Sequence, residues 1–329
     1  QNDLRFLLYL DPSQRLGALV LAEHSSGRLN PSTLSAVIAA SRLLSAAGSG
    51  SGSGSSPAAS SRPHPITVLV AGDDAGAVAS AAEEAAGAVA GVLSSSAAAS
   101  ASDPSSSAAA ASSKILTAVH PRLGHGLAEG LAQLVADLLR HEEAEEEMEV
   151  EVVEGGSGGN SSPFAAVAAP GSTFGRNVLP RAAALASRDM VSDVIAVNDT
   201  VSGSFTRPCY AGAALETVEY RDGGARFFTA RPSAFPVAAV DSSSSTSSPP
   251  LPIEALSPSE IEASVPPTAT PSSSIWLEDS GGGGSESERP DLGSARVVVS
   301  GGRALADAEG FASLARLADA FGPGVAAVG

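Results

Sequence analysis

Short apolar runs that alternate with capped, helix-like segments are the feature that most constrains how this chain can fold. Four apolar runs occur before residue 190: Gly17–Glu23, Ile66–Ala71, Lys114–Val119 and Phe164–Ala169. Uninterrupted runs of this length are typical of strands that are buried on both faces of a sheet. Because helix-like segments separate them, the sequence predicts an α/β fold with a parallel sheet flanked by helices.

The segments between these runs begin with residues that favour a helix start. Side chains of Asn, Asp, Ser and Thr can accept hydrogen bonds from the first free backbone N–H groups of a helix. Helices are predicted from these caps to about residues 44, 89 and 187, and another is predicted over 127–140. The caps are Asn30, Ser32 or Thr33, then Asp73 or Asp74, then Ser172 or Thr173.

The alternation changes after residue 190. Four strand-like segments follow one another without helices between them, and turn-forming glycines separate them. This pattern predicts an added antiparallel strand group at the edge of the parallel sheet. The segments are Val191–Val197, Phe205–Tyr210, Leu215–Tyr220 and Arg226–Arg231.

Composition divides the chain into domains. Three tracts rich in Ser, Gly, Ala or Glu, near 45–62, 94–113 and 142–162, read as insertions in an N-terminal α/β domain of residues 17–231. They cannot bury enough apolar surface to offset the entropy of the chain. Residues 1–16 are expected to form a disordered extension. The Ser/Pro/Gly-rich stretch 232–290 is expected to be a disordered linker.

Residues 291–329 resemble the start of a second α/β domain. A strand over 295–300 is followed by the turn Gly301-Gly302-Arg303 and then by a helix that opens near Asp307. Glycine lets a backbone approach a ligand closely, a helix N-terminus favours an anion, and arginine can bind a phosphate. A tight turn with a solvent-exposed arginine explains the same residues equally well. A lone strand–helix–strand start cannot bury its own faces, so we expect the domain to be truncated here.

Charge and motifs exclude several functions. The net charge is −17, and eight Glu residues lie between 142 and 154, so the chain is expected not to bind nucleic acid. No segment has the apolar length of a membrane span, so the chain is not expected to be membrane-embedded. With only Cys209, no intrachain disulfide can form. The five histidines lack metal or triad spacing, so no catalytic or metal residues are assigned.

Two further groups occur at predicted strand ends, where open α/β sheets bind ligands. His24 and His120 each follow an apolar run, although a loop histidine without a ligand is the more frequent case. Arg176 and Arg181 follow the predicted helix start at Ser172, and they could serve an anion or an acidic partner surface.

Five segments in the observed order resemble the alpha subunit of electron-transfer flavoprotein. The resemblance covers nearly all of the non-repetitive chain from about residue 17 to 329, and it is specific as an ordered set. One departure is Ala213, where the family usually has asparagine. The segments are Leu19–His24, Gly171–Arg181, Val191–Ile195, Thr206–Gly212 and Val297–Arg303.

The resemblance implies an electron carrier and not a substrate-converting enzyme. Members take electrons from acyl-CoA and other dehydrogenases onto FAD and pass them to a quinone oxidoreductase, in the mitochondrial matrix in eukaryotes. It implies a heterodimer with a beta subunit, which packs against the first domain. Within the second domain it implies a flavin contact for Arg303, with Gly301 and Gly302 beside it. Because further FAD-binding segments of the family are absent, we expect this chain alone not to retain FAD.

Two other functions are open. The first domain could be a nucleotide-fold interaction module that pairs with a beta-like subunit and does not hold FAD. A standalone enzyme of the doubly wound class would need a catalytic constellation, and the sequence offers none.

Overall fold

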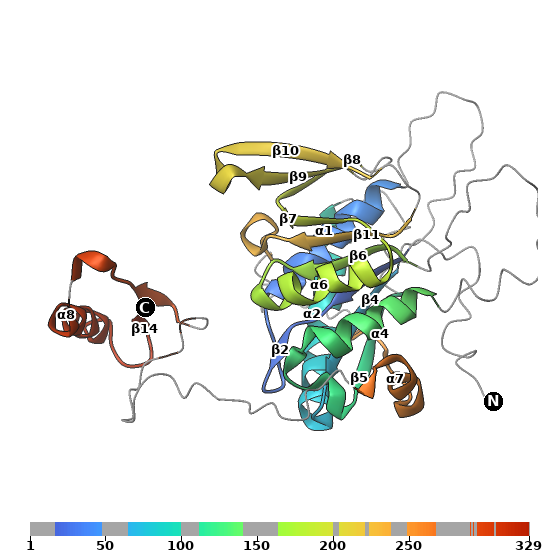
Figure 1. Cartoon of the computed structure of the whole chain (residues 1–329), viewed down its shortest axis with the longest axis horizontal. Helices are drawn as coiled ribbons and strands as arrows, with labels where there is room; N and C mark the ends of the chain where they lie inside the picture. The colour runs from blue at the N-terminus through green and yellow to red at the C-terminus, as the bar shows by residue number, and fades with distance from the viewer. Residues whose placement is uncertain are drawn as a thin grey trace, which may run out of the picture. The chain divides into compact units, whose positions relative to one another are not determined.

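The computed structural model describes residues 17–47, 65–99, 112–140, 164–199, 204–220, 224–237, 249–267 and 290–328 apart from 291, 293, 294 and 306. The chain divides into two compact units, residues 1–272 and 273–329. Figure 1 shows the elements of each unit. The predicted N-terminal extension and most of the three predicted insertions lie outside the described residues.

Unit 1 is built on a seven-stranded sheet in the order β12-β5-β4-β1-β6-β11-β7 (Figure 1). All six pairings between neighbours are parallel. The predicted parallel sheet is therefore confirmed. The strands are β1 (Gly17–Leu21), β4 (Ile66–Gly72), β5 (Lys114–Val119), β6 (Phe164–Pro170), β7 (Met190–Val194), β11 (Arg226–Ala230) and β12 (Ile253–Ala255).

Helices cover both faces of this sheet. Alternate residues of β1 show the division: Ala18 and Val20 belong to the core beneath α1 and α2, whereas Leu19 and Leu21 belong to the core beneath α4, α6 and α7. Strands buried on both faces explain the uninterrupted apolar runs. The helices are α1 (Ser32–Ala47), α2 (Ala75–Ala99), α4 (Ala128–Arg140), α6 (Thr173–Leu185) and α7 (Pro258–Ser264), with 3-10 turns η3 (Pro121–Gly126) and η5 (Pro232–Ala234).

One of these helices has the length and composition of a membrane span, so the expectation from the sequence that no segment is long and apolar enough is wrong. Within α2, the stretch Ala75–Ser95 is long and apolar enough to cross a membrane by length and composition alone. Half of its most apolar window is buried inside unit 1, and buried residues such as Val78 and Val89 belong to the core. Packing against the sheet accounts for the apolar character of α2.

The antiparallel group is smaller than the sequence predicts. It contains β8 (Ala196–Asp199), β9 (Ser204–Cys209) and β10 (Ala214–Glu219) in the order β10-β9-β8, and η4 (Tyr210–Gly212) connects β9 to β10. The predicted last strand belongs instead to the parallel sheet, as β11, and the predicted first strand, Val191–Val197, is divided between β7 of the parallel sheet and β8 of the antiparallel sheet. The reason is long-range pairing, since β11 inserts between β6 and β7. A two-stranded hairpin, β2 (His24–Ser25) and β3 (Arg28–Leu29), follows β1.

Part of the segment expected to be a disordered linker is ordered. Residues 249–267 contain β12, which adds to the sheet edge beside β5, and α7, which begins with a capping box formed by Ser257 and Glu260. A salt bridge of 2.7 Å joins Lys114 Nζ to Glu254. Proline-rich composition conceals these elements, although four apolar side chains anchor them in the core: Leu251, Leu256, Ile261 and Val265.

Unit 2 follows the predicted strand–turn–helix–strand order. Its elements are β13 (Val297–Val299), η7 (Arg303–Leu305), α8 (Ala308–Asp319) and β14 (Ala326–Val328). The two strands pair in parallel, and α8 is the crossover between them. This is one βαβ unit, the smallest piece of a parallel sheet.

Candidate functional site

The turn Gly301-Gly302-Arg303 lies directly after β13 in unit 2. All three residues are exposed to solvent. Arg303 begins η7. In this turn Leu305 N–H donates a hydrogen bond of 3.0 Å to the carbonyl oxygen of Gly302. The predicted strand–turn–helix placement is present, with a short 3-10 turn between the glycines and α8.

The two glycines have different roles. A Cβ atom on Gly301 would lie 2.1 Å from Leu305 Cδ1 and 2.6 Å from Leu314 Cδ1, which is closer than van der Waals contact allows. A side chain at Gly301 would therefore require the ends of these two leucine side chains to move. A Cβ atom on Gly302 would meet no atom within 4 Å among the described residues. The open backbone that a ligand could approach is that of Gly302.

The N-terminus of α8 does not form part of this turn. Helix α8 begins at Ala308, and the Asp307 side chain accepts a hydrogen bond of 2.8 Å from Gly310 N–H. This carboxylate satisfies a free N–H group and places a negative charge at the helix end, so the end does not attract an anion. The helix-end contribution expected from the sequence is absent. An anionic ligand would rely on the backbone of Gly302 and on Arg303.

Arg303 is available for such a contact. Its side chain is exposed, and within the described residues it forms no salt bridge. A guanidinium group presents several donors in a fixed plane, which suits a phosphate or the polar edge of an aromatic ring system. The open backbone at Gly302 and the exposed cation at Arg303 together suit an anionic group such as a phosphate.

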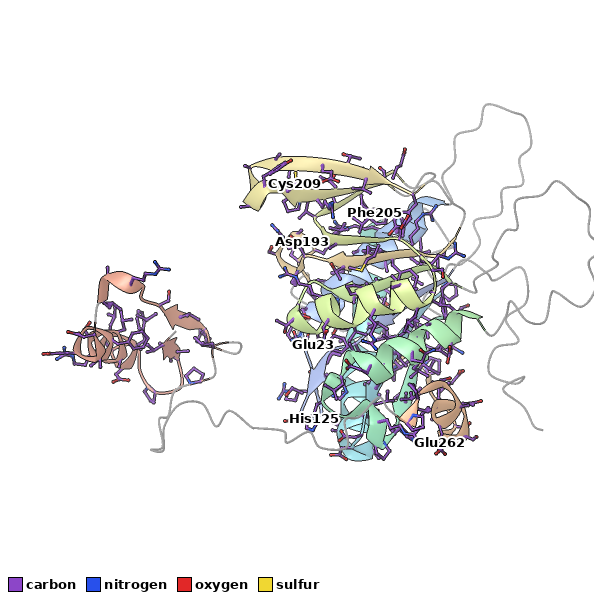
Figure 2. All side chains as sticks on the ribbon, in the orientation of Figure 1. Glu23, His125, Asp193, Phe205, Cys209 and Glu262 are labelled. Carbon is purple, nitrogen blue, oxygen red and sulfur yellow. The ribbon has the colours of Figure 1, made fainter. Side chains whose placement is uncertain are left out.

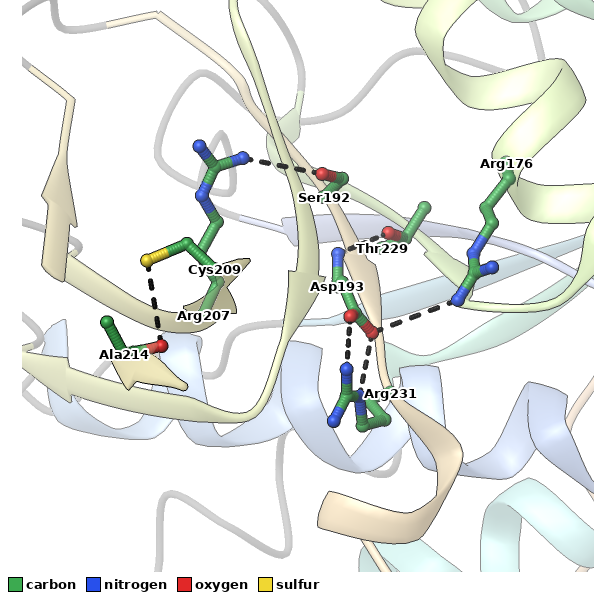
Figure 3. Close-up of polar contacts among 8 residues, drawn as sticks. All are labelled: Arg176, Ser192, Asp193, Arg207, Cys209, Ala214, Thr229 and Arg231. Atoms are coloured by element: carbon green, nitrogen blue, oxygen red, sulfur yellow. Dashed lines mark hydrogen bonds and ion pairs between the residues drawn. The ribbon is translucent and has the colours of Figure 1, made fainter. Parts of the chain in front are cut away.

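A second polar cluster lies in unit 1 at the carboxyl ends of β7 and β11. Asp193 accepts two hydrogen bonds from Arg231, one of them 2.9 Å from Nε, and lies 4.0 Å from Arg176 Nη2 (Figure 3). Hydrogen bonds from Arg231 hold the pKa of the Asp193 carboxyl below its ordinary value. Asp193 N–H also donates to the buried Thr229 Oγ1 at 2.8 Å.

This cluster holds a bend of the main chain. Asp193 has φ +60°, a left-handed conformation that few residues other than glycine adopt. Two residues later, Ile195 N–H bonds to Thr206 and the chain enters the antiparallel sheet. The side chain of Asp193 therefore fixes the point where the chain leaves the parallel sheet. Sequence reasoning did not identify this role, because its partners Thr229 and Arg231 lie 36 and 38 residues away.

The other residues considered from the sequence make structural contacts. Arg181 lies 3.7 Å from Glu129 and joins α6 to α4. His24 Nε2 lies 2.9 Å from the carbonyl oxygen of Ala71, and His120 Nδ1 accepts a hydrogen bond from Arg122 N–H. Within the described ranges, no group of three or more His, Cys, Asp or Glu side chains could hold a metal ion.

Fold and site together define a two-unit α/β protein whose second unit carries an exposed glycine–arginine turn after its first strand. Comparison with known families adds an independent finding: residues 87–255 match the electron transfer flavoprotein domain, and the match extends through β12.

Curated relatives agree with this match. The chain is 31% identical over 315 residues to the mitochondrial electron transfer flavoprotein subunit alpha of Arabidopsis thaliana, which covers 96% of this chain and 68% of the relative. It is 34% identical over 215 residues to subunit alpha of Paracoccus denitrificans, covering 65% and 56%. With subunit alpha of Pseudomonas aeruginosa it shares 30% identity over 312 residues, covering 95% and 73%.

The chain therefore belongs to the electron transfer flavoprotein family, among the alpha subunits. The fold class and the family inferred from the sequence are confirmed, and membership gives the chain an electron transfer flavoprotein role. Relatives from Arabidopsis, Dictyostelium and Cryptococcus are named mitochondrial, whereas those from Paracoccus and Pseudomonas are bacterial.

Proposed function

We propose that this chain is the alpha subunit of a heterodimeric electron carrier. It pairs with an electron-transfer flavoprotein beta subunit, and within that complex its second unit supplies contacts to FAD from the turn Gly301-Gly302-Arg303. Electrons pass from acyl-CoA and other dehydrogenases to the flavin, and then to a quinone oxidoreductase in fatty-acid and amino-acid oxidation. The proposed location is the mitochondrial matrix. The family match over half of the chain is the observation that supports this role most directly.

The cofactor side of the proposal rests on the turn in unit 2. FAD supplies the redox chemistry when it is bound. Arg303 would place a positive charge beside the flavin, and Gly302 would let the backbone approach it. Gly301 lies against the side-chain ends of Leu305 and Leu314, so its backbone is less open than that of Gly302. A fixed cation near the flavin favours the state with more negative charge and so raises the reduction potential.

The test compares two exposed arginines of unit 2 in the complex with a beta subunit. Arg303→Ala is expected to lower the flavin content of the purified complex and to lower its reduction potential. Arg316→Ala removes a cation from α8 and should leave both values unchanged, because Arg316 lies outside the turn. Flavin absorbance per complex and spectroelectrochemical titration give the readouts. Equal values for wild type and Arg303→Ala would refute the role of Arg303.

One alternative remains supported by an observation. Unit 1 is compact and has its own two-sided core, so it can serve as an interaction module that pairs with a beta-like subunit without FAD. A stable wild-type heterodimer that contains no flavin after reconstitution with FAD would favour this alternative over the carrier.

A further inference from the structure

The segment 249–267 packs along one edge of unit 1 and has a pair of prolines at each end. Its strand β12 pairs with β5 over only three residues, whereas β5 pairs with β4 over six. The other six strands of the sheet therefore keep all their pairings without this segment. The family match ends at Ala255, so α7 lies beyond it. The segment is an addition to the sheet and not a part on which the sheet depends.

Buried apolar side chains attach the segment to unit 1. Leu251 and Leu256 are buried, and Ile261 and Val265 of the α7 region are fully buried. The site that receives Val265 includes Gly130 of α4, where a Cβ atom would lie 3.2 Å from Val265 Cγ1. These four side chains supply most of the attraction between the segment and unit 1, because burial of apolar surface is favourable.

Charge complementarity adds a second attraction. The segment contains three glutamates and no lysine or arginine. Lys114, the only lysine of the sequence, lies 2.7 Å from Glu254 and is 17% exposed. Arg122 Nη2 lies 3.7 Å from Glu262, and Arg122 Nη1 donates a hydrogen bond of 2.7 Å to the carbonyl oxygen of Val265. Figure 2 shows Glu262 on α7, at the periphery of unit 1.

Neither element of the segment can keep its structure away from unit 1. Helix α7 has seven residues, and isolated helices shorter than about 12 residues are marginal in water. A three-residue strand such as β12 needs a partner strand for its hydrogen bonds. The two elements therefore attach and detach together, as one locally cooperative unit.

We propose that residues 249–267 form a releasable strap that sets the length of chain joining the two units. Between Val237 and Pro290 there are 52 residues, 238–289, and attachment of the strap leaves 22 of them, 268–289, between the strap and Pro290. A chain spans at most about 3.5 Å per residue, so attachment reduces the greatest possible reach from about 180 Å to about 75 Å. A shorter tether raises the effective concentration of one unit near the other. This role goes beyond the proposed function and does not require bound flavin.

The first test is hydrogen exchange of the full chain, measured by mass spectrometry. Amides of β12 and α7 are expected to exchange at one common rate, at least about 10-fold faster than those of β1 and β6, because the strap opens without unfolding of the sheet. Equal exchange rates in the strap and in β1 would overturn the proposal, since the segment would then open only when unit 1 unfolds.

A matched pair of variants in α7 tests the anchor. Ile261→Ser removes a fully buried side chain and should raise the exchange rate of the strap amides roughly 30-fold or more, while the rate in β1 is unchanged. Ala263→Ser, at an exposed position of the same helix, should change neither rate. If Ile261→Ser unfolds unit 1, Glu254→Gln is measured, and it should raise the rate in the strap about threefold. No effect of Glu254→Gln in that case would overturn the proposal.

The single lysine gives an independent readout of release. Lys114 is paired with Glu254 and largely covered in the attached state, so its amine should react slowly with N-hydroxysuccinimidyl acetate. Peptide mass spectrometry measures the acetylation rate at Lys114. Ile261→Ser should increase this rate by the same factor as the exchange of the strap amides, because both processes require release. Acetylation at the wild-type rate in Ile261→Ser would overturn the proposal.

The tether role has its own measurement. Small-angle X-ray scattering of the full chain should give a larger radius of gyration for Ile261→Ser than for wild type and Ala263→Ser, because release adds 30 residues to the 22 of the short tether. An unchanged radius of gyration in a variant whose strap amides exchange rapidly would overturn the tether role. Flavin content does not enter any of these measurements, so failure of the strap and failure of the carrier function are distinguishable.

Discussion

Replacement of Phe205 by alanine tests how the antiparallel sheet is attached to the parallel sheet. Phe205 on β9 is fully buried, and its ring centroid lies 5.0 Å from that of Phe228 on β11 and 5.9 Å from that of Tyr220. It also belongs to the core cluster that contains α1 and α2. This side chain is thus the main apolar contact from β9 into the core of unit 1.

The magnitude follows from burial. Truncation of a buried phenylalanine to alanine costs about 3–5 kcal/mol, because transfer free energy is lost and a cavity remains. For a domain of this size each kcal/mol lowers the melting temperature by about 2–4 °C, so Phe205→Ala should lower it by roughly 6–20 °C. Differential scanning calorimetry measures the change. Leu215→Ala on the neighbouring β10 is the control, and since Leu215 is exposed it should alter stability by less than about 0.5 kcal/mol.

A loss below about 1 kcal/mol for Phe205→Ala would refute the packing argument, since a fully buried ring cannot be removed so cheaply. A comparable loss for Leu215→Ala would refute the assignment of the β10 outer face to solvent.

Two further predictions concern the described contacts. Asp193→Asn should lower the free energy of unfolding at neutral pH, because it removes the carboxylate that Arg231 stabilises. Since Arg231 lowers the pKa of Asp193 in the folded chain, the stability difference between wild type and variant is complete above about pH 4 and disappears as the pH falls through the lowered pKa. Urea unfolding at several pH values measures this difference. Gly175→Ala should cost at least about 1–3 kcal/mol, because its Cβ would lie 1.9 Å from the Pro170 carbonyl oxygen. Gly87→Ala, in α2 with open space around it, should instead stabilise by about 0.5–1 kcal/mol, and similar effects at both glycines would contradict the packing.

Features encoded locally could be predicted from the sequence. The apolar runs coincide with β1, β4, β5 and β6, because a strand buried on both faces needs apolar residues throughout. The caps are equally local: Ser172 accepts from Gly175 N–H at the start of α6, three residues away.

Features that depend on distant partners could not be predicted. A local pattern marks β11 as a strand, but its position between β6 and β7 depends on pairings with segments far away in the chain. The same holds for β12, whose three residues are stabilised by pairing with Ile115–Thr117 on β5. The proline-rich composition around β12 predicted disorder, because composition reports the average tendency of a segment to fold and cannot identify a specific contact.

The candidate site likewise has some features that residues near in the sequence determine and others that depend on distant segments. By itself the sequence determined the β/α order, the family and the turn at Gly301, Gly302 and Arg303, since these depend on residue type and spacing along the chain. Only the tertiary structure showed that Gly301 faces the side chains of Leu305 and Leu314 whereas Gly302 is open, and that Asp193 holds the bend between the sheets. The physical reason is that these roles are set by atoms from other segments, such as Leu314 and Arg231, whose proximity exists only once the chain has folded.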